Sequence, residues 1–138
     1  CAIKARVVEK DERESKYRMI LNFGHTIGHA LEALPGYSGL KHGEAVAIGM
    51  VYAARISRET GRCSSAVCER IDGLVDKLGL PSRLPDLRTR EIIDAMYLDK
   101  KAENKNIRFI LVKDIGSIEI AESVSEPVLK KVLEDRVI

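Results

Sequence analysis

The segment LNFGHTIGHALEALPGYSGLKHGEAVAIGM, residues 21–50, decides the fold because it contains two helical patterns separated by a short turn. Pro35 and Gly36 end the first pattern, and a Gly-rich loop over residues 36–41 follows it. The second pattern, over residues 42–60, is apolar nearly all round, which is typical of a helix in the middle of a bundle. We therefore expect two helices joined by a short loop, the second of them in the middle of a bundle.

Helical periodicity and capping residues predict the other elements. The first expected elements are a helical stretch over residues 2–33, a helix capped by Ser64 with an apolar stripe at Val67, Ile71, Leu74, Val75 and Leu78, and a helix capped by Thr89 that runs through residue 98. A polar and basic loop over residues 99–106 follows, and then strands over residues 107–112 and 117–120 joined around residues 114–116. A last helix is capped by Ser125, with Pro127 in its first turn. The predicted fold class is mainly α: a multihelical bundle with one small β-hairpin.

The composition indicates one globular domain and excludes several classes of partner. A length of 138 residues is enough for one domain and hardly for two. Lys plus Arg is 23 and Asp plus Glu is 21, which argues against a nucleic-acid arm or a polybasic membrane tail. No apolar run is long enough for a transmembrane helix. We expect no nucleic-acid partner and no membrane partner.

The ends and the cysteines of the chain suggest a piece of a cytoplasmic protein. The first residue is Cys1 rather than Met, and a patterned segment follows directly, so we expect the chain to be cut from a longer protein. No secretory leader is evident. Cys63 and Cys68 show no metal-type pairing, which predicts free thiols in a reducing compartment.

A stripe of polar side chains follows one face of the first helical stretch. At about 100° per residue the stripe spans an arc of about 80°. Its members are Glu14, Arg18, Asn22, His25, His29 and Glu32. The simplest interpretation is a solvated helix face, but such faces favour Lys, Glu and Gln. Gly24 and Gly28 each cost roughly 1 kcal/mol relative to Ala inside a helix, and such glycines usually admit another backbone or a ligand. The stripe therefore indicates the wall of a polar cleft.

All histidines of the chain lie between residues 25 and 42. His25 and His29 are four residues apart, a spacing that can hold one divalent metal or place a ligand beside an acid/base. His42 precedes a predicted helix, where the dipole disfavours imidazolium and favours the neutral form that binds metal. Two histidines and a carboxylate make an open catalytic site. Glu44 is either that carboxylate or a favourable first-turn acid, and surface histidines are the alternative to a metal site.

These motifs resemble the signature of the 3-dehydroquinate synthase family. The resemblance rests on LNFGHTIGHALEAL (21–34) and KHGEAVAIGM (41–50), with IKARVVEKDERE upstream and LDKKAENKNIRFILVKDIG downstream in the same order and spacing. It covers nearly the whole chain. It implies that residues 1–138 form the C-terminal metal- and substrate-binding helical domain, and that the N-terminal NAD-binding domain is absent.

The resemblance also implies an activity. The family converts DAHP, a seven-carbon keto sugar-acid phosphate, into 3-dehydroquinate and phosphate in the shikimate pathway of aromatic amino-acid biosynthesis. The reaction is a phosphate-eliminating carbon–oxygen lyase reaction that uses NAD and a divalent metal, zinc or cobalt. The expected intact protein is a cytoplasmic homodimer that binds a small phosphorylated sugar-acid, and the fragment alone is expected to be inactive.

Residue roles follow from the resemblance, position by position. It implies His25 and His42 as metal ligands, His29 and Glu14 as catalytic residues, and Lys4, Arg18, Asn22 and one of Lys100 and Lys101 as substrate-binding residues. The third metal ligand, a Glu, would lie in the absent part. Three alternatives stay open: a related sugar-phosphate cyclase, a metal-dependent alcohol dehydrogenase-like domain, and a non-catalytic metal-binding module.

Overall fold

The computed structural model describes residues 2–11, 17–84, 88–101 and 107–135. Its elements are, in chain order, α1 (Ala2–Asp11), the 3-10 helix η1 (Tyr17–Asn22), α2 (His25–Ala33), the 3-10 helix η2 (Pro35–Tyr37), α3 (His42–Glu59), α4 (Ser65–Lys77), α5 (Thr89–Lys101), β1 (Phe109–Asp114), β2 (Ser117–Ala121) and α6 (Glu126–Glu134). The predicted mainly α bundle with one antiparallel hairpin is confirmed.

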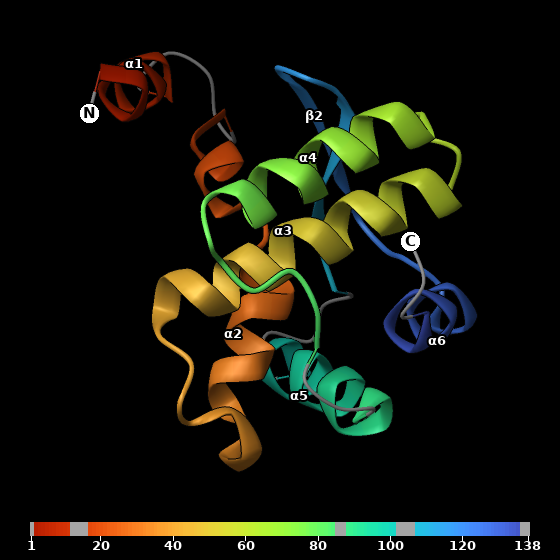
Figure 1. Ribbon diagram of the computed structural model, residues 1–138. Helices are drawn as coiled ribbons and strands as arrows, with labels where there is room; N and C mark the ends of the chain where they lie inside the picture. Colours follow the sequence, from red (N-terminus) through yellow and green to blue (C-terminus); the bar gives the residue numbers. More distant parts are fainter. Residues whose placement is uncertain (1, 12–16, 85–87, 102–106, 136–138) are drawn as a thin grey trace.

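Helix α3 is the centre of the bundle. It contacts α2, α4, β1 and α6, and Figure 1 shows it running through the middle of the molecule. Its side chains are buried on every face from Ala45 to Ser57, as its nearly continuous apolar sequence predicts. No described helix is long and apolar enough to cross a membrane.

Three glycines bring α2 and α3 into backbone contact. A Cβ on Gly24 would lie 2.7 Å from the Met50 backbone nitrogen, and one on Gly28 would lie 3.2 Å from the Val46 Cα. A Cβ on Gly49 would overlap the carbonyl oxygen of Gly24. The prediction that Gly24 and Gly28 admit another backbone is thus confirmed, and the approaching backbone is that of α3.

The single helical stretch predicted over residues 2–33 is wrong. Gly24 has a φ of 82°, in the left-handed region, and it separates η1 from α2. The polar stripe is therefore not one helix face. His25, His29 and Glu32 lie on α2, the backbone of Arg18 and Asn22 belongs to η1, and Glu14 lies outside the described residues.

Two further expectations need correction. The loop predicted over residues 99–106 is wrong for residues 99–101, because α5 continues to Lys101; residues 102–106 lie outside the described part. In α4, Val67 and Val75 are buried, but Leu74 and Leu78 are exposed. The apolar stripe of α4 is therefore wider than the part of it that packs on the bundle.

The predicted helix caps have mixed outcomes. Ser64 caps α4, since its hydroxyl accepts a hydrogen bond from the Val67 N–H at 3.3 Å. Thr89 is instead the first residue of α5, and its buried hydroxyl has no partner among the described residues. Ser125 occupies the N-cap position of α6 without a side-chain cap bond, and Pro127 sits in the first turn as predicted.

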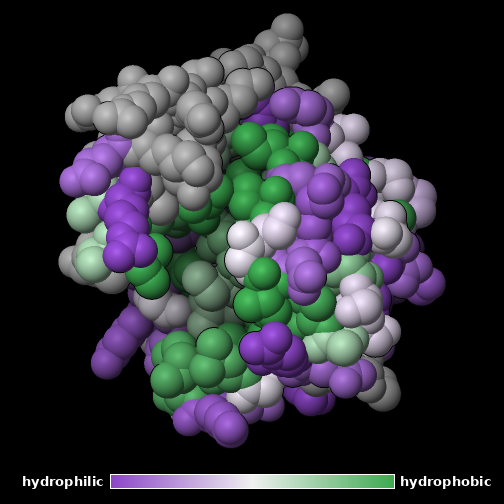
Figure 2. Space-filling view, turned by 90° about the horizontal axis from the view of Figure 1, so that it is seen from above, coloured by the Kyte–Doolittle hydropathy of each residue, from purple (hydrophilic) through white to green (hydrophobic). Residues whose placement is uncertain are grey.

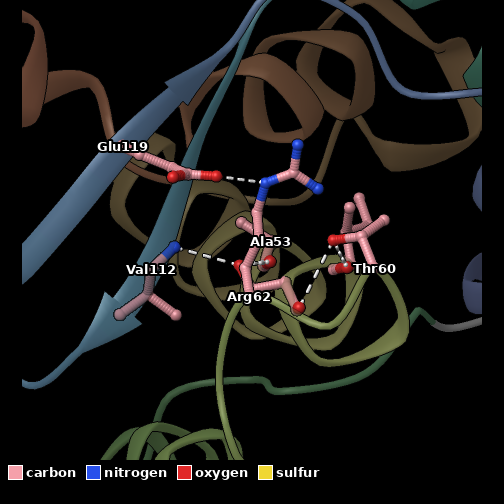
Figure 3. A network of polar contacts seen from close by, with 7 residues as sticks. Ala53, Thr60, Arg62, Val112 and Glu119 are labelled. Carbon is pink, nitrogen blue, oxygen red and sulfur yellow. Dashed lines mark hydrogen bonds and ion pairs between the residues drawn. The ribbon is translucent and has the colours of Figure 1, made fainter.

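A polar network fastens the hairpin to α3 (Figure 3). The Ser57 hydroxyl donates to the Ala53 carbonyl at 2.8 Å and accepts from the Val112 N–H at 2.9 Å. Arg62 and Glu119 form an ion pair between the end of α3 and β2. The hairpin is therefore held against the bundle by hydrogen bonds as well as by the buried residues of β1.

Hydrophobic and hydrophilic side chains are separated on the face seen from above. Figure 2 shows hydrophobic residues around a hollow on this face, with hydrophilic residues gathered beside it. Helix α1 lies on the same side of the molecule, apart from α3, and its main contact is with η1 (Figure 1).

The α2–α3 contact predicts opposite effects of alanine at two helical glycines. Gly49→Ala should destabilise the protein by about 3 kcal/mol or more, because backbone atoms cannot move away from the new methyl group. Gly73→Ala is the matched control on α4, where a Cβ meets nothing within 4 Å, and it should stabilise by roughly 0.5–1 kcal/mol. Urea unfolding of both variants measures the difference, and equal stabilities would contradict the packing.

A buried ion pair joins α3 to α4. Arg55 is 1% exposed, and its Nη2 lies 3.7 Å from Asp72 Oδ2. Its Nη1 donates to the Asp135 carbonyl at 3.3 Å, and its guanidinium lies 4.7 Å from the centre of the Tyr52 ring. Because both charges are buried, removing one leaves the other without compensation.

The ion pair predicts a strong asymmetry between single and double substitution. Asp72→Ala should cost about 3–5 kcal/mol of stability, whereas the double variant Arg55→Met with Asp72→Leu should cost much less, since no charge stays buried alone. Thermal and urea unfolding measure both. A single variant as stable as the parent protein would show that the pair is solvated.

Candidate metal and substrate site

Three imidazole rings meet where α2 and α3 begin. The ring centres of His25 and His42 are 5.5 Å apart, those of His25 and His29 are 5.3 Å apart, and those of His29 and His42 are 6.2 Å apart. His25 is the first residue of α2, His29 follows one turn later, and His42 is the first residue of α3. The structure therefore brings together the two predicted metal ligands and the predicted catalytic histidine.

The glycine contact explains this meeting of side chains. Gly24 immediately precedes His25, and its carbonyl group lies against Gly49 of α3. Gly28, one turn later, packs on Val46, one turn after His42. Bulkier residues at these positions would push α2 away from α3, and the imidazoles of the two helices would separate.

Oxygen acceptors engage the Nδ1 atoms of His25 and His42. His25 Nδ1 lies 3.3 Å from the Phe23 carbonyl oxygen, and His42 Nδ1 lies 2.9 Å from Glu32 Oε1. Since a carbonyl and a carboxylate only accept, Nδ1–H is the donor in each pair, and the lone pair of a neutral ring with this hydrogen bond is on Nε2. The hydrogen bonds thus favour, for both neutral rings, the tautomer in which Nε2 is available to a metal.

The spacing of the two rings fits one metal ion. Zinc binds imidazole nitrogen at about 2.0–2.1 Å in a tetrahedral arrangement, which puts the centres of two ligand rings roughly 5 Å apart. The His25–His42 separation of 5.5 Å is close to that value. Within the described ranges, no three His, Cys, Asp or Glu side chains are placed to hold one ion.

Glu44 is a first-turn acid, which was one of the two alternatives. Its Oε2 accepts a hydrogen bond from the Lys41 N–H at 2.8 Å, in a capping box at the start of α3. The carboxylate therefore stabilises the helix end on which His42 sits. It is not grouped with the histidines as a metal ligand.

A hollow of about 440 Å³ lies beside His25, between α1 and η1. Lys4, Met19, Leu21, Asn22 and His25 line it. The structure thus brings together two predicted substrate-binding residues, Lys4 and Asn22, and one predicted metal ligand.

The structure does not describe the side chains of the other predicted site residues. Glu14 and the side chains of Arg18, Lys100 and Lys101 lie outside the described part, although the backbone of Arg18 is in η1 and that of both lysines is in the last turn of α5.

Helix α2 is also attached to the segment just before β1. The Thr26 hydroxyl donates a hydrogen bond to the Arg108 carbonyl oxygen at 3.0 Å.

Two features of the site could not be predicted from the sequence. Glu32 belongs to the predicted polar stripe, but nothing in the sequence shows that it reaches His42 across the turn between the helices. Gly49 lies within an apolar helix. The absence of a side chain is the only sequence signal that another helix backbone could lie close to it.

The described cysteines are free thiols, as predicted. Burial raises the pKa of the Cys68 thiol above its usual value. Burial also raises the pKa of Cys63, with a smaller contribution from Cys68, while Arg58 opposes both effects. Fewer thiolates therefore form at neutral pH, which makes these side chains poor nucleophiles and poor metal ligands.

The raised thiol pKa values predict slow alkylation. At pH 8 iodoacetamide should modify Cys63 and Cys68 more slowly than free cysteine, and the rate should still be rising above pH 9, because the thiolate forms only above its usual pKa. Mass spectrometry of the native protein follows the reaction, and the unfolded protein is the control. Native thiols that react as fast as free cysteine would contradict the effect of burial.

Comparison with known proteins identifies the class of domain. The sequence model described as 3-dehydroquinate synthase C-terminal matches residues 1–102. The 3-dehydroquinate synthase of Thermoanaerobacter pseudethanolicus is 46% identical over 130 residues, which are 94% of this chain and 36% of the relative. That of Geobacter sp. strain M21 is 54% identical over 117 residues, 85% of this chain and 32% of the relative.

The chain belongs to the 3-dehydroquinate synthase C-terminal family. It spans about a third of the length of the curated relatives that it matches.

Solved structures show the same fold. A 2-deoxy-scyllo-inosose synthase crystallised with carbaglucose-6-phosphate, NAD⁺ and Co²⁺ aligns with a TM-score of 0.79 and 29% identity, over 96% of this chain and 39% of that chain. A 2-epi-5-epi-valiolone synthase from Streptomyces hygroscopicus subsp. jinggangensis 5008 aligns with a TM-score of 0.76 and 24% identity, over 93% of this chain and 35% of that chain.

Proposed function

We propose that this chain is the metal- and substrate-binding C-terminal domain of a 3-dehydroquinate synthase, a lyase that converts DAHP into 3-dehydroquinate and phosphate. The family match over residues 1–102 and the identity of 46–54% to synthases over most of the chain support the proposal. The observation that carries it is the pair of imidazoles, His25 and His42, with ring centres 5.5 Å apart and both Nδ1 atoms engaged by acceptors.

The proposal includes a second domain and two cofactors. An NAD-binding N-terminal domain in the longer protein would account for the length of the relatives, and it would also supply a Glu as third metal ligand. NAD and zinc or cobalt are proposed because a structure with the same fold and 29% identity contains NAD⁺ and Co²⁺. A divalent metal, when bound, supplies the Lewis acidity that favours oxidation of a substrate hydroxyl. We further propose a cytoplasmic homodimer.

The chain's own residues would divide the remaining tasks. His25 and His42 hold the metal through Nε2, and His29, with its ring centre 5.3 Å from that of His25, is placed to move a proton beside it. Glu14 is assigned to the same pocket by family resemblance alone. In this proposal the Glu14 carboxylate takes part in catalysis.

Substrate anions require fixed cations and donors. DAHP carries a phosphate and a carboxylate, and Lys4 and Asn22 line the hollow next to His25. Lys4 supplies an ammonium group for the carboxylate, and Asn22 an amide donor near the phosphate. Arg18 suits a bidentate contact with the carboxylate, and one of Lys100 and Lys101 suits the phosphate.

A related sugar-phosphate cyclase is the second candidate. The similarity to 2-deoxy-scyllo-inosose synthase, at a TM-score of 0.79, favours it as an alternative. Identity separates the two candidates, because it is 29% to that cyclase and 46–54% to synthases. The family match also favours the synthase over an alcohol dehydrogenase-like domain.

Turnover by the full-length protein tests the proposal. With NAD⁺ and Zn²⁺ or Co²⁺ it should release phosphate from DAHP, whereas residues 1–138 alone should release none. Arg18→Ala should raise KM for DAHP and leave NAD⁺ affinity unchanged, since its role is to bind the substrate carboxylate.

A substrate comparison distinguishes the two candidates. The full-length protein should leave a hexose 6-phosphate unchanged, because that substrate has no carboxylate. Turnover of hexose 6-phosphate without turnover of DAHP would assign the chain to the alternative cyclase. Phosphate release by residues 1–138 alone would contradict the need for a second domain.

A further inference from the structure

We infer that Glu32 is a positioning residue that orients His42 as a metal ligand. Glu32 Oε1 accepts a hydrogen bond from His42 Nδ1–H at 2.9 Å, which turns Nε2 toward the position where a metal would lie. The inference rests on the proposed function only in taking His42 as a ligand.

The Glu32–His42 hydrogen bond depends on tertiary structure, because its two residues lie on different helices. Glu32 lies in the last turn of α2, and His42 begins α3, ten residues later. The intervening chain forms η2 and then the loop that precedes α3. A contact across this turn forms only when α2 and α3 lie together, as their glycine contact ensures.

Burial does not fix the His42 ring. Its side chain is 60% exposed, so packing leaves the ring free to rotate, and the carboxylate of Glu32 is the group that holds its Nδ1. His25 differs, since its Nδ1 faces the backbone carbonyl of Phe23 only two residues away. One ligand is thus held by its own backbone and the other by a side chain.

The neighbouring polar groups do not replace Glu32 as the hydrogen-bond partner of His42. Glu44, the other carboxylate at the start of α3, accepts from the Lys41 N–H. His29 stacks at 6.2 Å from the His42 ring centre. Hydrogen bonds from carboxylates to metal-bound histidines fix the tautomer and raise the basicity of the ligand, and their loss typically weakens metal affinity 10–100-fold.

If Glu32 only stabilised the fold, removing its carboxylate would lower the stability of the protein rather than its metal affinity. Glu32 is 33% exposed in its side chain, and ion pairs at such surfaces contribute little to stability. Removing the carboxylate should therefore leave the urea midpoint nearly unchanged while weakening the metal site. A loss of stability without a loss of metal affinity would assign Glu32 to the fold alone.

Cobalt binding to the full-length, metal-free protein tests the inference. Titration with Co²⁺, followed by its d–d absorption, should show affinity about 10–100-fold weaker in Glu32→Ala than in the parent protein. Glu32→Gln should recover part of the loss, because its carbonyl oxygen still accepts from Nδ1–H. Glu69→Ala, which removes an exposed carboxylate from α4, is the matched control and should bind Co²⁺ as the parent does.

A second measurement needs no metal. In nitrogen NMR spectra of the metal-free protein, His42 should be mainly the Nδ1–H tautomer in the parent and a mixture of tautomers in Glu32→Ala. Unchanged Co²⁺ affinity and an unchanged His42 tautomer in Glu32→Ala would overturn the inference. So would full Co²⁺ affinity in His42→Ala, because His42 would then not be a ligand.

The outcomes separate this inference from the proposed function. A protein that does not turn over DAHP but loses Co²⁺ affinity in Glu32→Ala would keep the inference and refute the function. Turnover of DAHP with parental Co²⁺ affinity in Glu32→Ala would keep the function and refute the inference.

Discussion

The backbone contact between α2 and α3 is the constraint on which the site depends. Gly24, Gly28 and Gly49 remove the side chains that would hold the two helices apart. As a result the first residue of each helix, His25 and His42, presents its imidazole to the same space. The apolar faces of α2 and α3 add the buried core that keeps this contact closed.

The two halves of the site are built differently. The histidines stand on α2 and α3, which pack on the core of the bundle. Lys4 and Asn22 come from α1 and η1, and the main contact of α1 is with η1. The position of the histidines is therefore set by the bundle, whereas the hollow lined by Lys4 and Asn22 is set by local contacts near the start of the chain.

Most of the fold could be predicted from local sequence patterns, whereas the contacts between helices could not. The all-round apolar pattern of α3 and the hairpin turn are visible in the sequence because burial and turn chemistry are local. The break at Gly24 was missed because a left-handed glycine leaves the apolar periodicity intact. The meeting of His25 with His42 was expected from motif resemblance, but the bond from His42 to Glu32 depends on the distance between two helices, which no spacing encodes.

Anomalous diffraction from crystals of the full-length protein with zinc tests the central claim most directly. An ion bonded to Nε2 of both His25 and His42, each at about 2.0–2.1 Å, is the result that the glycine contact and the ring spacing predict. Zinc bound elsewhere, or bound to only one of these histidines while the other turns away, would contradict it.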